Sequence, residues 1–418
     1  MNVFKFGGAS VSTTERVHNV AGILRRYASD TLLVVISAMG KTTNALEKVV
    51  EAFFRKDKEE ALRLFEGIKE SHRAAAADLG LTDTSFLNDF FTEVEWLLHD
   101  NPVRDFDYYY DQVVCVGELL STAIVSRFLN EQGVANTWLD VRDIIRTDDN
   151  FRDARIDWEF TAQRVRESVR PLLEAPGSIV LTQGFIGATD GNESTTLGRE
   201  GSDYTAAIFA NLLEAQGQTI WKDVQGVMNA DPKQYENAQW IRELNYREVI
   251  EMAYYGAQVI HPKTIKPLQN KGIPLYVKSF INPDAEGTII HSSHVDGLPP
   301  IIVYKRQQVL VELSSRDFSF VGEGLTAELY RIFEELKFKP NLTQNGAVSF
   351  LCVVDDHAEK VDALAHHAAQ YFDVQLRRDL TLLTIRHHND ELVAQLCGDS
   401  GIILKQQTPE TLQVLMAQ

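Results

Sequence analysis

The sequence predicts an α/β fold: an αβα sandwich with a mainly parallel central sheet, followed by two ferredoxin-like βαββαβ modules, the second truncated. Three observations predict it. Short apolar runs rich in β-branched residues end at glycines, as buried parallel strands do. Helix-patterned stretches separate these runs, which is the order of a sandwich whose ligand loops follow the strand ends. Beyond about residue 300 the order of elements changes to strand, helix, strand, strand, helix, strand.

The N-terminal part alternates strands and helices. Runs predicted as strands are TLLVVISAMG (31–40), GSIVLTQGFIG (177–187) and TIWKDVQGV (219–227), and helices are predicted over 15–29 and 202–217. From about residue 44 to residue 130 the pattern is almost continuously helical, which indicates a helical insertion covering one side of the sheet.

A boundary is predicted near residues 279–300, where proline, glycine and polar residues gather without periodicity. We expect a catalytic-type domain over 1–292, and a linker with the first strand of the C-terminal region over 293–307. The first module then covers 308–380. The second, over 381–418, stops before its second helix and last strand, and the strand 301–305 is a candidate to complete it.

Charge and apolar content limit the classes of function. Lys and Arg total 41 against 59 Asp and Glu, a net charge of −18, which disfavours nucleic acid and anionic membranes as partners. The three cysteines have no metal or disulfide spacing. The N-terminus lacks the long apolar stretch of a signal peptide, and no uninterrupted apolar segment is long enough to span a bilayer. We therefore expect a cytoplasmic protein.

Four glycine-containing stretches are candidates for a ligand site. They are KFGGAS (5–10), SAMGKTTN (37–44), TTLGREGSDYTAA (195–207) and WKDVQGVMNADPK (221–233). Each alone fits a tight turn as well as a site. Together they place small, polar and charged residues after successive predicted strands.

The first stretch has the features of a phosphate cradle. Gly7 and Gly8 allow backbone N–H groups to approach phosphate oxygens, and a helix is predicted to begin within a few residues. Lys5 supplies a point charge. The P-loop motif is absent. Gly40-Lys41-Thr42 matches only the last three residues of that motif, and its earlier glycine is missing.

The third and fourth stretches add charges. Arg199 can hold a carboxylate in a bidentate fork, with Ser202 donating at a helix start. Asp203 either stabilises that helix start or orients Lys5 and metal-bound phosphates. Lys222, Asp223 and Lys233 surround a turn that is either ordinary loop chemistry or a nucleotide-contacting loop.

None of these stretches contains histidine, and His261 before Pro262 is interpreted as a helix cap or a packing residue rather than a catalyst. A reaction without a histidine base suits a carboxylate nucleophile, which is already ionised at neutral pH. Phosphoryl transfer to a carboxylate depends on positioning and on charge neutralisation, which Lys5, Arg199 and Mg²⁺ could supply.

Taken in order, KFGGASV, SAMGKTTN, GELLS, TQGFIGA, TTLGREGSDYTAA, DVQGVMNADP and YGAQVIHPKT resemble the aspartate kinase (aspartokinase) family, which has the amino-acid-kinase fold. The C-terminal modules resemble paired ACT domains. The resemblance implies ATP- and Mg²⁺-dependent phosphorylation of the L-aspartate side-chain carboxylate to 4-phospho-L-aspartate. That reaction opens the route to lysine, threonine, methionine and isoleucine.

The resemblance also implies roles for single residues. Lys5 and Asp203 are expected to be catalytic. Aspartate is expected to bind Thr43, Glu118, Arg199 and Ser202. The nucleotide is expected to bind Lys5, Gly7, Gly8, Ser10, Ser37, Lys222, Asp223, Met228, Lys233 and Gln258, while no metal ligand is assigned. Ala9, Lys222, Met228, Lys233 and Gln258 depart from the family's usual residues.

In this family the ACT modules dimerise and bind end-product amino acids, so a homodimer and a lysine or threonine effector are expected. A purely structural role of the modules stays open, since NLTQNGAVS (341–349) matches the usual effector loop poorly. Two other functions stay open. One is another carboxylate kinase of the same fold, glutamate 5-kinase-like or acetylglutamate kinase-like; the other is a catalytically weak amino-acid-sensing protein.

Overall fold

The chain forms two compact units, each with its own sheet. The computed structural model describes residues 1–317, 319–398 and 401–417, so Phe318, Asp399, Ser400 and Gln418 of the predicted modules lie outside the described residues. Unit 1 comprises Met1–Val227, Trp240–Ile250 and Val259–Val295. Unit 2 comprises Met228–Gln239, Glu251–Gln258 and Asp296–Gln418.

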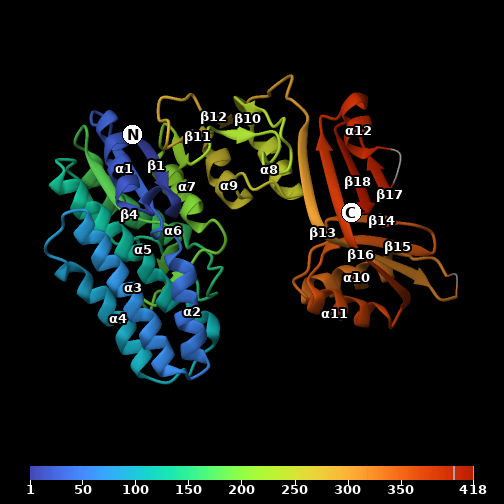
Figure 1. The fold of residues 1–418 in the computed structure, drawn as a ribbon, viewed down its shortest axis with the longest axis horizontal. Coiled ribbons are helices and arrows are strands. Elements are labelled where there is room, and N and C mark those ends of the chain that lie inside the picture. Colours follow the sequence, from blue (N-terminus) through green and yellow to red (C-terminus); the bar gives the residue numbers. More distant parts are fainter. Residues whose placement is uncertain (318, 399–400, 418) are drawn as a thin grey trace. The chain divides into compact units, whose positions relative to one another are not determined.

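Unit 1 is built on an eight-stranded sheet with the order β10-β12-β11-β7-β1-β2-β4-β3, of which Figure 1 labels β1, β4, β10, β11 and β12. All neighbouring pairs run parallel except β11 and β12. The mainly parallel α/β class predicted from the sequence is thereby confirmed. The strands are β1 (Asn2–Phe6), β2 (Leu32–Ile36), β3 (Thr137–Leu139), β4 (Ile179–Gln183), β7 (Gln218–Lys222), β10 (Glu243–Asn245), β11 (Leu275–Ser279) and β12 (Thr288–His291), with a separate hairpin of β5 (Ile186–Ala188) and β6 (Ser194–Thr196).

Nine α-helices are described from the start of the chain to residue 295. Four of them form the expected helical insertion, and the last of these, α5, packs on β2, β3 and β4. Helix α8 begins in unit 1 and ends in unit 2. The helices are α1 (Thr14–Arg26), α2 (Thr42–Phe54), α3 (Lys58–Asp78), α4 (Asn88–His99), α5 (Phe106–Glu131), α6 (Trp158–Arg164), α7 (Gly201–Leu213), α8 (Tyr246–Tyr255) and α9 (Pro262–Lys271).

Helix α5 is long and largely apolar, although its apolar residues do not form the uninterrupted run that the sequence lacks. By length and composition it could cross a membrane, but 83% of its most apolar window is buried inside the protein. Polar residues such as Asp111 and Glu118 interrupt the apolar residues of α5. It is apolar because it is a core helix, surrounded by the sheet and by other helices.

The sheet of unit 1 brings the predicted ligand loops to one edge. In the register of the central strands, Phe6 lies opposite both Ile36 and Trp221, and Ile36 lies opposite Gln183. The loops after β1, β2, β4 and β7 therefore start side by side. Carboxyl ends of parallel strands are where open α/β sheets bind ligands.

Unit 2 contains a six-stranded sheet with the order β14-β15-β13-β16-β18-β17, antiparallel throughout. Helices α10 and α11 bury apolar side chains against one part of the sheet and α12 against another. The elements are β13 (Ile301–Ser315), α10 (Glu323–Glu335), β14 (Leu342–Asn345), β15 (Ser349–Asp355), α11 (Ala358–Ala368), β16 (Phe372–Arg386), α12 (Asp390–Cys397), β17 (Ile402–Gln407) and β18 (Thr411–Ala417).

Two long strands, β13 and β16, join the predicted modules into one sheet. The modules expected over 308–380 and 381–418 share β16, because this strand runs unbroken for 15 residues. Asp379 has a left-handed φ of 59°, and the pairing with β13 shifts register nearby, so the chain bends there without ending the strand. Residues 301–305 pair with 382–386, which joins them to the final segment.

Candidate active site

A cavity of about 530 Å³ opens at the strand ends of unit 1, within the size range of small-molecule sites. Its lining comes from the loops after β1, β2, β4 and β6 and from α2, α5 and α7. Most of the residues predicted from the sequence are brought together here. Those that line the cavity are Lys5, Gly8, Ser37, Thr43, Glu118, Arg199, Ser202, Asp203 and Lys222.

An ion pair lies at the centre of this set. The Nζ atom of Lys5, near the end of β1, is 2.7 Å from Oδ1 of Asp203 in the first turn of α7. The two side chains are 12% and 4% exposed. Oδ1 has no hydrogen-bond partner of good geometry among the described residues, so this contact is an ion pair and the carboxylate retains capacity for a ligand. Both charges are therefore desolvated but accessible from the cavity.

The loop after β1 lies too close to the neighbouring strand end for a side chain at Gly8. A Cβ atom there would lie 2.6 Å from the carbonyl oxygen of Ala38. The chain then forms a short 3₁₀ helix, Gly8–Val11, before α1 starts with Thr13 as its cap. Ser10 is buried in this turn and, like Gly7, does not line the cavity. Their nucleotide contacts stay predictions.

The N-terminus of α7 supplies the polar groups opposite Lys5. Glu200 precedes the helix in the left-handed conformation, with φ 54°, and its Oε2 accepts a hydrogen bond of 2.8 Å from the backbone N–H of His261. At Gly184 a Cβ atom would lie 2.5 Å from Cβ of Ser202. Close contact between the end of β4 and the start of α7 thus fixes where Ser202 and Asp203 lie.

Glu118 is the buried acid of the cavity. It projects from the middle of α5, is 3% exposed, and its Oε2 has no partner among the described residues. Burial raises the pKa of Glu118 to about 8, against the charge of Lys5 and a backbone hydrogen bond from Ala38. An unpartnered buried carboxylate facing a cavity is suited to receive a cationic group of a ligand.

Arg199 and Thr43 stand nearer the solvent. Arg199 is exposed and Thr43 is half-buried in the first turn of α2. Arg199 therefore lines the cavity from its solvent-exposed side, where its guanidinium can bind the carboxylate of a ligand.

The predicted nucleotide residues are divided between the units. Lys222 ends β7 and its Nζ donates to the carbonyl of Val259 at 2.7 Å, while Asp223 is exposed outside the cavity lining. Met228, Lys233 and Gln258 belong to unit 2, and their contact with a nucleotide stays a prediction.

The cavity also contains residues to which the sequence analysis gave no role: Tyr110, Arg152, Phe185, Thr196 and Glu200. Arg152, Phe185 and Glu200 have left-handed φ angles of 68°, 72° and 54°. Such angles in non-glycine residues are uncommon and concentrate at functional sites. No local pattern marks these positions, because the conformation is imposed by contacts with distant segments.

Asp111, on α5, fixes the backbone of two residues that line the cavity, Arg152 and Thr196. It is fully buried on α5, and its carboxylate accepts from the N–H and Oγ1 of Thr196 at 2.8 and 2.7 Å and from the N–H of Arg152 at 3.0 Å. Burial raises the pKa of Asp111 to about 6 despite these hydrogen bonds. The guanidinium of Arg152 lies 4.3 Å from the ring centroid of Tyr110.

No histidine lines the cavity within the described residues. His261 instead caps α9, its ring accepting from the N–H of Lys263, as the sequence indicated. Across the described ranges no group of three or more His, Cys, Asp or Glu side chains could hold a metal ion.

Comparisons with known proteins agree with this geometry. The amino acid kinase family matches residues 1–279. Lysine-sensitive aspartokinase 3 of Escherichia coli is 32% identical over 84% of this chain and 78% of its own length. Aspartokinase 1 of Arabidopsis thaliana is 34% identical over 84% of this chain and 63% of its own. A bifunctional aspartokinase/homoserine dehydrogenase of the same plant is 35% identical, but the match spans only 32% of that longer protein.

Solved structures give the same result. E. coli aspartokinase III in complex with aspartate and ADP matches with a TM-score of 0.84 and 28% identity, covering 100% of this chain and 96% of that one. The same enzyme with lysine and aspartate matches with a TM-score of 0.80 and 27% identity. With its parallel sheet, its Lys5–Asp203 pair at the strand ends and these relatives, the chain belongs to the amino acid kinase family and, within it, to the aspartokinases.

Proposed function

We propose that this protein is an aspartate kinase that transfers the γ-phosphoryl group of ATP to the side-chain carboxylate of L-aspartate. The observation that carries the proposal is the desolvated Lys5–Asp203 ion pair in a cavity that also contains Arg199, Ser202 and Glu118. A carboxylate oxygen of aspartate forms the new bond to phosphorus, and the bond to the leaving ADP oxygen breaks. The sequence order of motifs and the aspartate and ADP bound to E. coli aspartokinase III support this substrate pair.

The residues of the cavity divide into two functions. Lys5 neutralises charge on the transferring phosphoryl group, next to the close backbone approach at Gly8. Arg199 and Ser202 hold the α-carboxylate of aspartate, and Glu118 accepts its ammonium group. The buried, unpartnered Oε2 of Glu118 supports the last assignment, which favours a free amine over an N-acylated substrate.

Mg²⁺ fits this site only together with the nucleotide. Asp203 is a single available carboxylate, and Mg²⁺ in kinases is commonly held by one or two carboxylates plus substrate phosphates. When bound, the ion neutralises the phosphate oxygens.

Two residues that depart from the family on the nucleotide side suggest that the positive charge of Lys222 compensates for the charge lost at Gln258. Lys222 stands where relatives usually carry threonine, and Gln258 where they carry lysine. The Nζ of Lys222 donates to Val259, next in the chain after Gln258, which supports a cation supplied from a different position. Lys222→Thr alone should raise the KM for ATP, and adding Gln258→Lys should restore it. An unchanged KM in the single variant contradicts the compensation.

We also propose a domain assignment: 1–292 catalytic, 293–418 regulatory, with ACT-like modules over 308–380 and over 381–418 completed by 301–305. Homodimerisation through these modules and inhibition by lysine or threonine belong to the same proposal. The pairing of 301–305 with 382–386 supports the completed second module, and the lysine complex of E. coli aspartokinase III supports an amino-acid effector.

A hydroxamate assay tests the function. Purified protein is incubated with ATP, Mg²⁺ and hydroxylamine plus aspartate, glutamate or N-acetylglutamate. We expect acyl hydroxamate from aspartate alone. Preference for glutamate or N-acetylglutamate indicates a different carboxylate kinase, and no turnover with any of them indicates a sensing protein without catalysis. Repeating the aspartate reaction with added lysine, threonine or methionine tests the effector.

A further inference from the structure

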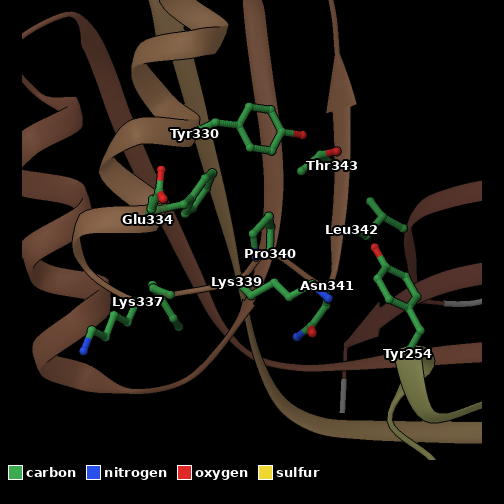
Figure 2. Close-up of a pocket in the computed structure, with 11 residues that line it drawn as sticks. Tyr254, Tyr330, Glu334, Lys337, Lys339, Pro340, Asn341, Leu342 and Thr343 are labelled. Atoms are coloured by element: carbon green, nitrogen blue, oxygen red, sulfur yellow. The ribbon is translucent and has the colours of Figure 1, made fainter. Parts of the chain in front are cut away.

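Unit 2 contains a second ligand-sized cavity, which none of the predicted site residues lines. It measures about 450 Å³ and lies between the C-terminal half of α10, the loop 336–341 and the start of β14. Figure 2 shows its labelled side chains, with Tyr330 and Glu334 projecting from α10 and Tyr254 from the end of α8. A smaller hollow of about 240 Å³ shares Tyr254 and residues 337–341 with it.

The floor of this cavity is apolar. Phe333, Phe338 and Leu342 are buried, and Pro340 stands between the larger side chains (Figure 2). Tyr254 and Tyr330 are 52% and 48% exposed, so their rings offer apolar surface to a ligand that removes it from water. The apolar part of a ligand would lie here.

The rim is basic in a strongly acidic protein. Lys305, Lys337, Lys339 and Lys360 line the two hollows with His357, against the carboxylates of Asp355 and Glu334. The chain as a whole carries a net charge of −18. Four lysines in one place thus reverse the sign of the global charge at this rim, which raises the local concentration of anions.

Most of this positive charge is not neutralised by the protein. Lys337, Lys339 and Lys360 form no ion pair among the described residues: the ammonium of Lys339 lies 4.4 Å from the ring centroid of Tyr254, and that of Lys360 donates to the carbonyl of Lys337 at 2.8 Å.

The nearby carboxylate of Asp355 is engaged by amides. It accepts 2.9 Å hydrogen bonds from Gln308 and Asn341, and Asn341 in turn accepts from Lys305 at 2.6 Å. This network fixes the base of the rim and leaves three ammonium groups for a ligand.

Lys337 has a backbone conformation that glycine adopts more easily than lysine does. Lys337 follows α10 in the left-handed conformation, with φ 46°, and its N–H caps the helix by donating to Glu334. Glycine is the residue this position favours. A lysine held there is under backbone strain, which glycine would relieve.

We propose that this cavity binds a small organic anion with an apolar or aromatic body, its carboxylate or phosphate at the lysine rim and its body against Tyr330, Phe333 and Phe338. A cationic amino acid such as lysine does not fit it, because the rim would repel a second ammonium group. The proposal does not depend on the kinase activity.

The experiment uses the full-length protein and the fluorescent aryl anion anilinonaphthalene sulfonate, which emits strongly when withdrawn from water. Phenyl phosphate should displace the dye, inorganic phosphate should do so only weakly for want of an apolar body, and L-lysine should not displace it. Lys337→Gly should weaken phenyl phosphate binding about fivefold to tenfold, as expected for one lost charged contact, with a melting temperature unchanged or raised.

Lys56→Gly is the matched control. Lys56 also lies two residues beyond the end of a helix, α2, with φ 66°, but in unit 1 and outside both hollows. It should gain the same relief of backbone strain without loss of binding. Lys339→Gln provides a second rim variant with an unaltered backbone preference. Equal affinity of Lys337→Gly, Lys339→Gln and Lys56→Gly for phenyl phosphate, or displacement of the dye by L-lysine as effective as by phenyl phosphate, overturns the proposal.

Discussion

Lys5 and Asp203, to which the proposed function assigns the catalytic role, are two opposite charges held together with little exposure to water. In such surroundings a charge acts more strongly than it would in solvent. The pair is held by β1 on one side and by the first turn of α7 on the other. Its strength therefore depends on two segments that are far apart in the chain.

Removal of the Lys5 charge should mainly affect the chemical step. Lys5→Ala is expected to lower kcat by at least about 100-fold, as for loss of a transition-state charge stabiliser, measured as aspartyl hydroxamate formed per minute. Lys48→Ala, which removes an exposed lysine of α2, should leave kcat unchanged. A Lys5→Ala enzyme within a few-fold of the parent rate contradicts the assigned role.

Glu118 should make stability depend on pH in the ligand-free protein. Its pKa is raised by burial from 4.5 to about 8, so between these values the folded state holds a proton that the unfolded state has released. The free energy of unfolding therefore falls as pH rises through this window, by at most about 1.4 kcal/mol per pH unit from this group. The full penalty is present above the folded pKa.

Glu118→Gln should remove that contribution. Urea unfolding at about pH 6 and about pH 8 is expected to give a smaller loss of stability for the variant than for the parent. Glu51→Gln, at an exposed position of α2, should retain the parent's loss. A parent and a Glu118→Gln variant with the same pH dependence would argue that Glu118 is ionised in the folded state throughout.

At the scale of elements, the contact between the end of β4 and α7 positions the proposed aspartate pocket. Gly184 permits this contact, since an added Cβ would meet the backbone Cα of Ser202 at 2.7 Å as well as its Cβ. Backbone atoms cannot turn away as a flexible side chain can. The strand and the helix would have to separate.

Gly184→Ala is thus expected to destabilise the fold by about 2 kcal/mol and to raise the KM for aspartate more than it lowers kcat. Gly22→Ala, in helix α1 with no atom within 4 Å of the added Cβ, should instead stabilise by about 0.5–1 kcal/mol. The measurements are urea unfolding and steady-state kinetics with aspartate varied. If the two glycine variants behave alike, the close contact at Ser202 is not what requires glycine at 184.

At the scale of the whole molecule, helix α8 and the residues after it connect the two units along the chain. Tyr254, near the end of α8, borders the basic cavity of unit 2. A few residues later, Val259 accepts from Lys222 and His261 donates to Glu200 in unit 1. One continuous segment thus carries contacts to both cavities.

Gly256 lies in the middle of this segment and should be sensitive to substitution. Its φ is 108°, and an added Cβ would lie 2.4 Å from Cε of Lys305, whose ammonium is hydrogen-bonded to Asn341. Gly256→Ala is expected to destabilise by about 2 kcal/mol through backbone strain and displacement of Lys305. Thermal and urea unfolding measure it.

The matched comparison is Gly272→Ala. Gly272 has φ 65°, inside the left-handed region that L-residues can adopt, and nothing lies within 4 Å of its added Cβ. Its loss should be nearer 1 kcal/mol. Equal losses of unfolding free energy in the two variants would show that the contact with Lys305 does not contribute to the destabilisation of Gly256→Ala.

The sequence alone determined the α/β class, the helical insertion, the order of elements in the C-terminal region and the charges at Lys5, Arg199 and Asp203. These follow from patterns of neighbouring residues: apolar periodicity, glycines after strands and helix-start residues, all of which act over a few positions of the chain. The family resemblance added roles to those charges.

Only the tertiary structure decided which groups those residues contact and how deeply they are buried. It paired Lys5 with Asp203, buried Glu118 so that its pKa rises, and brought Arg152 and Phe185 to the cavity in left-handed conformations. It also fused the two predicted modules through β13 and β16 and gathered four lysines at one rim of unit 2. Burial and electrostatic environment depend on segments distant in sequence that pack together, and local patterns of residues do not encode which segments those are.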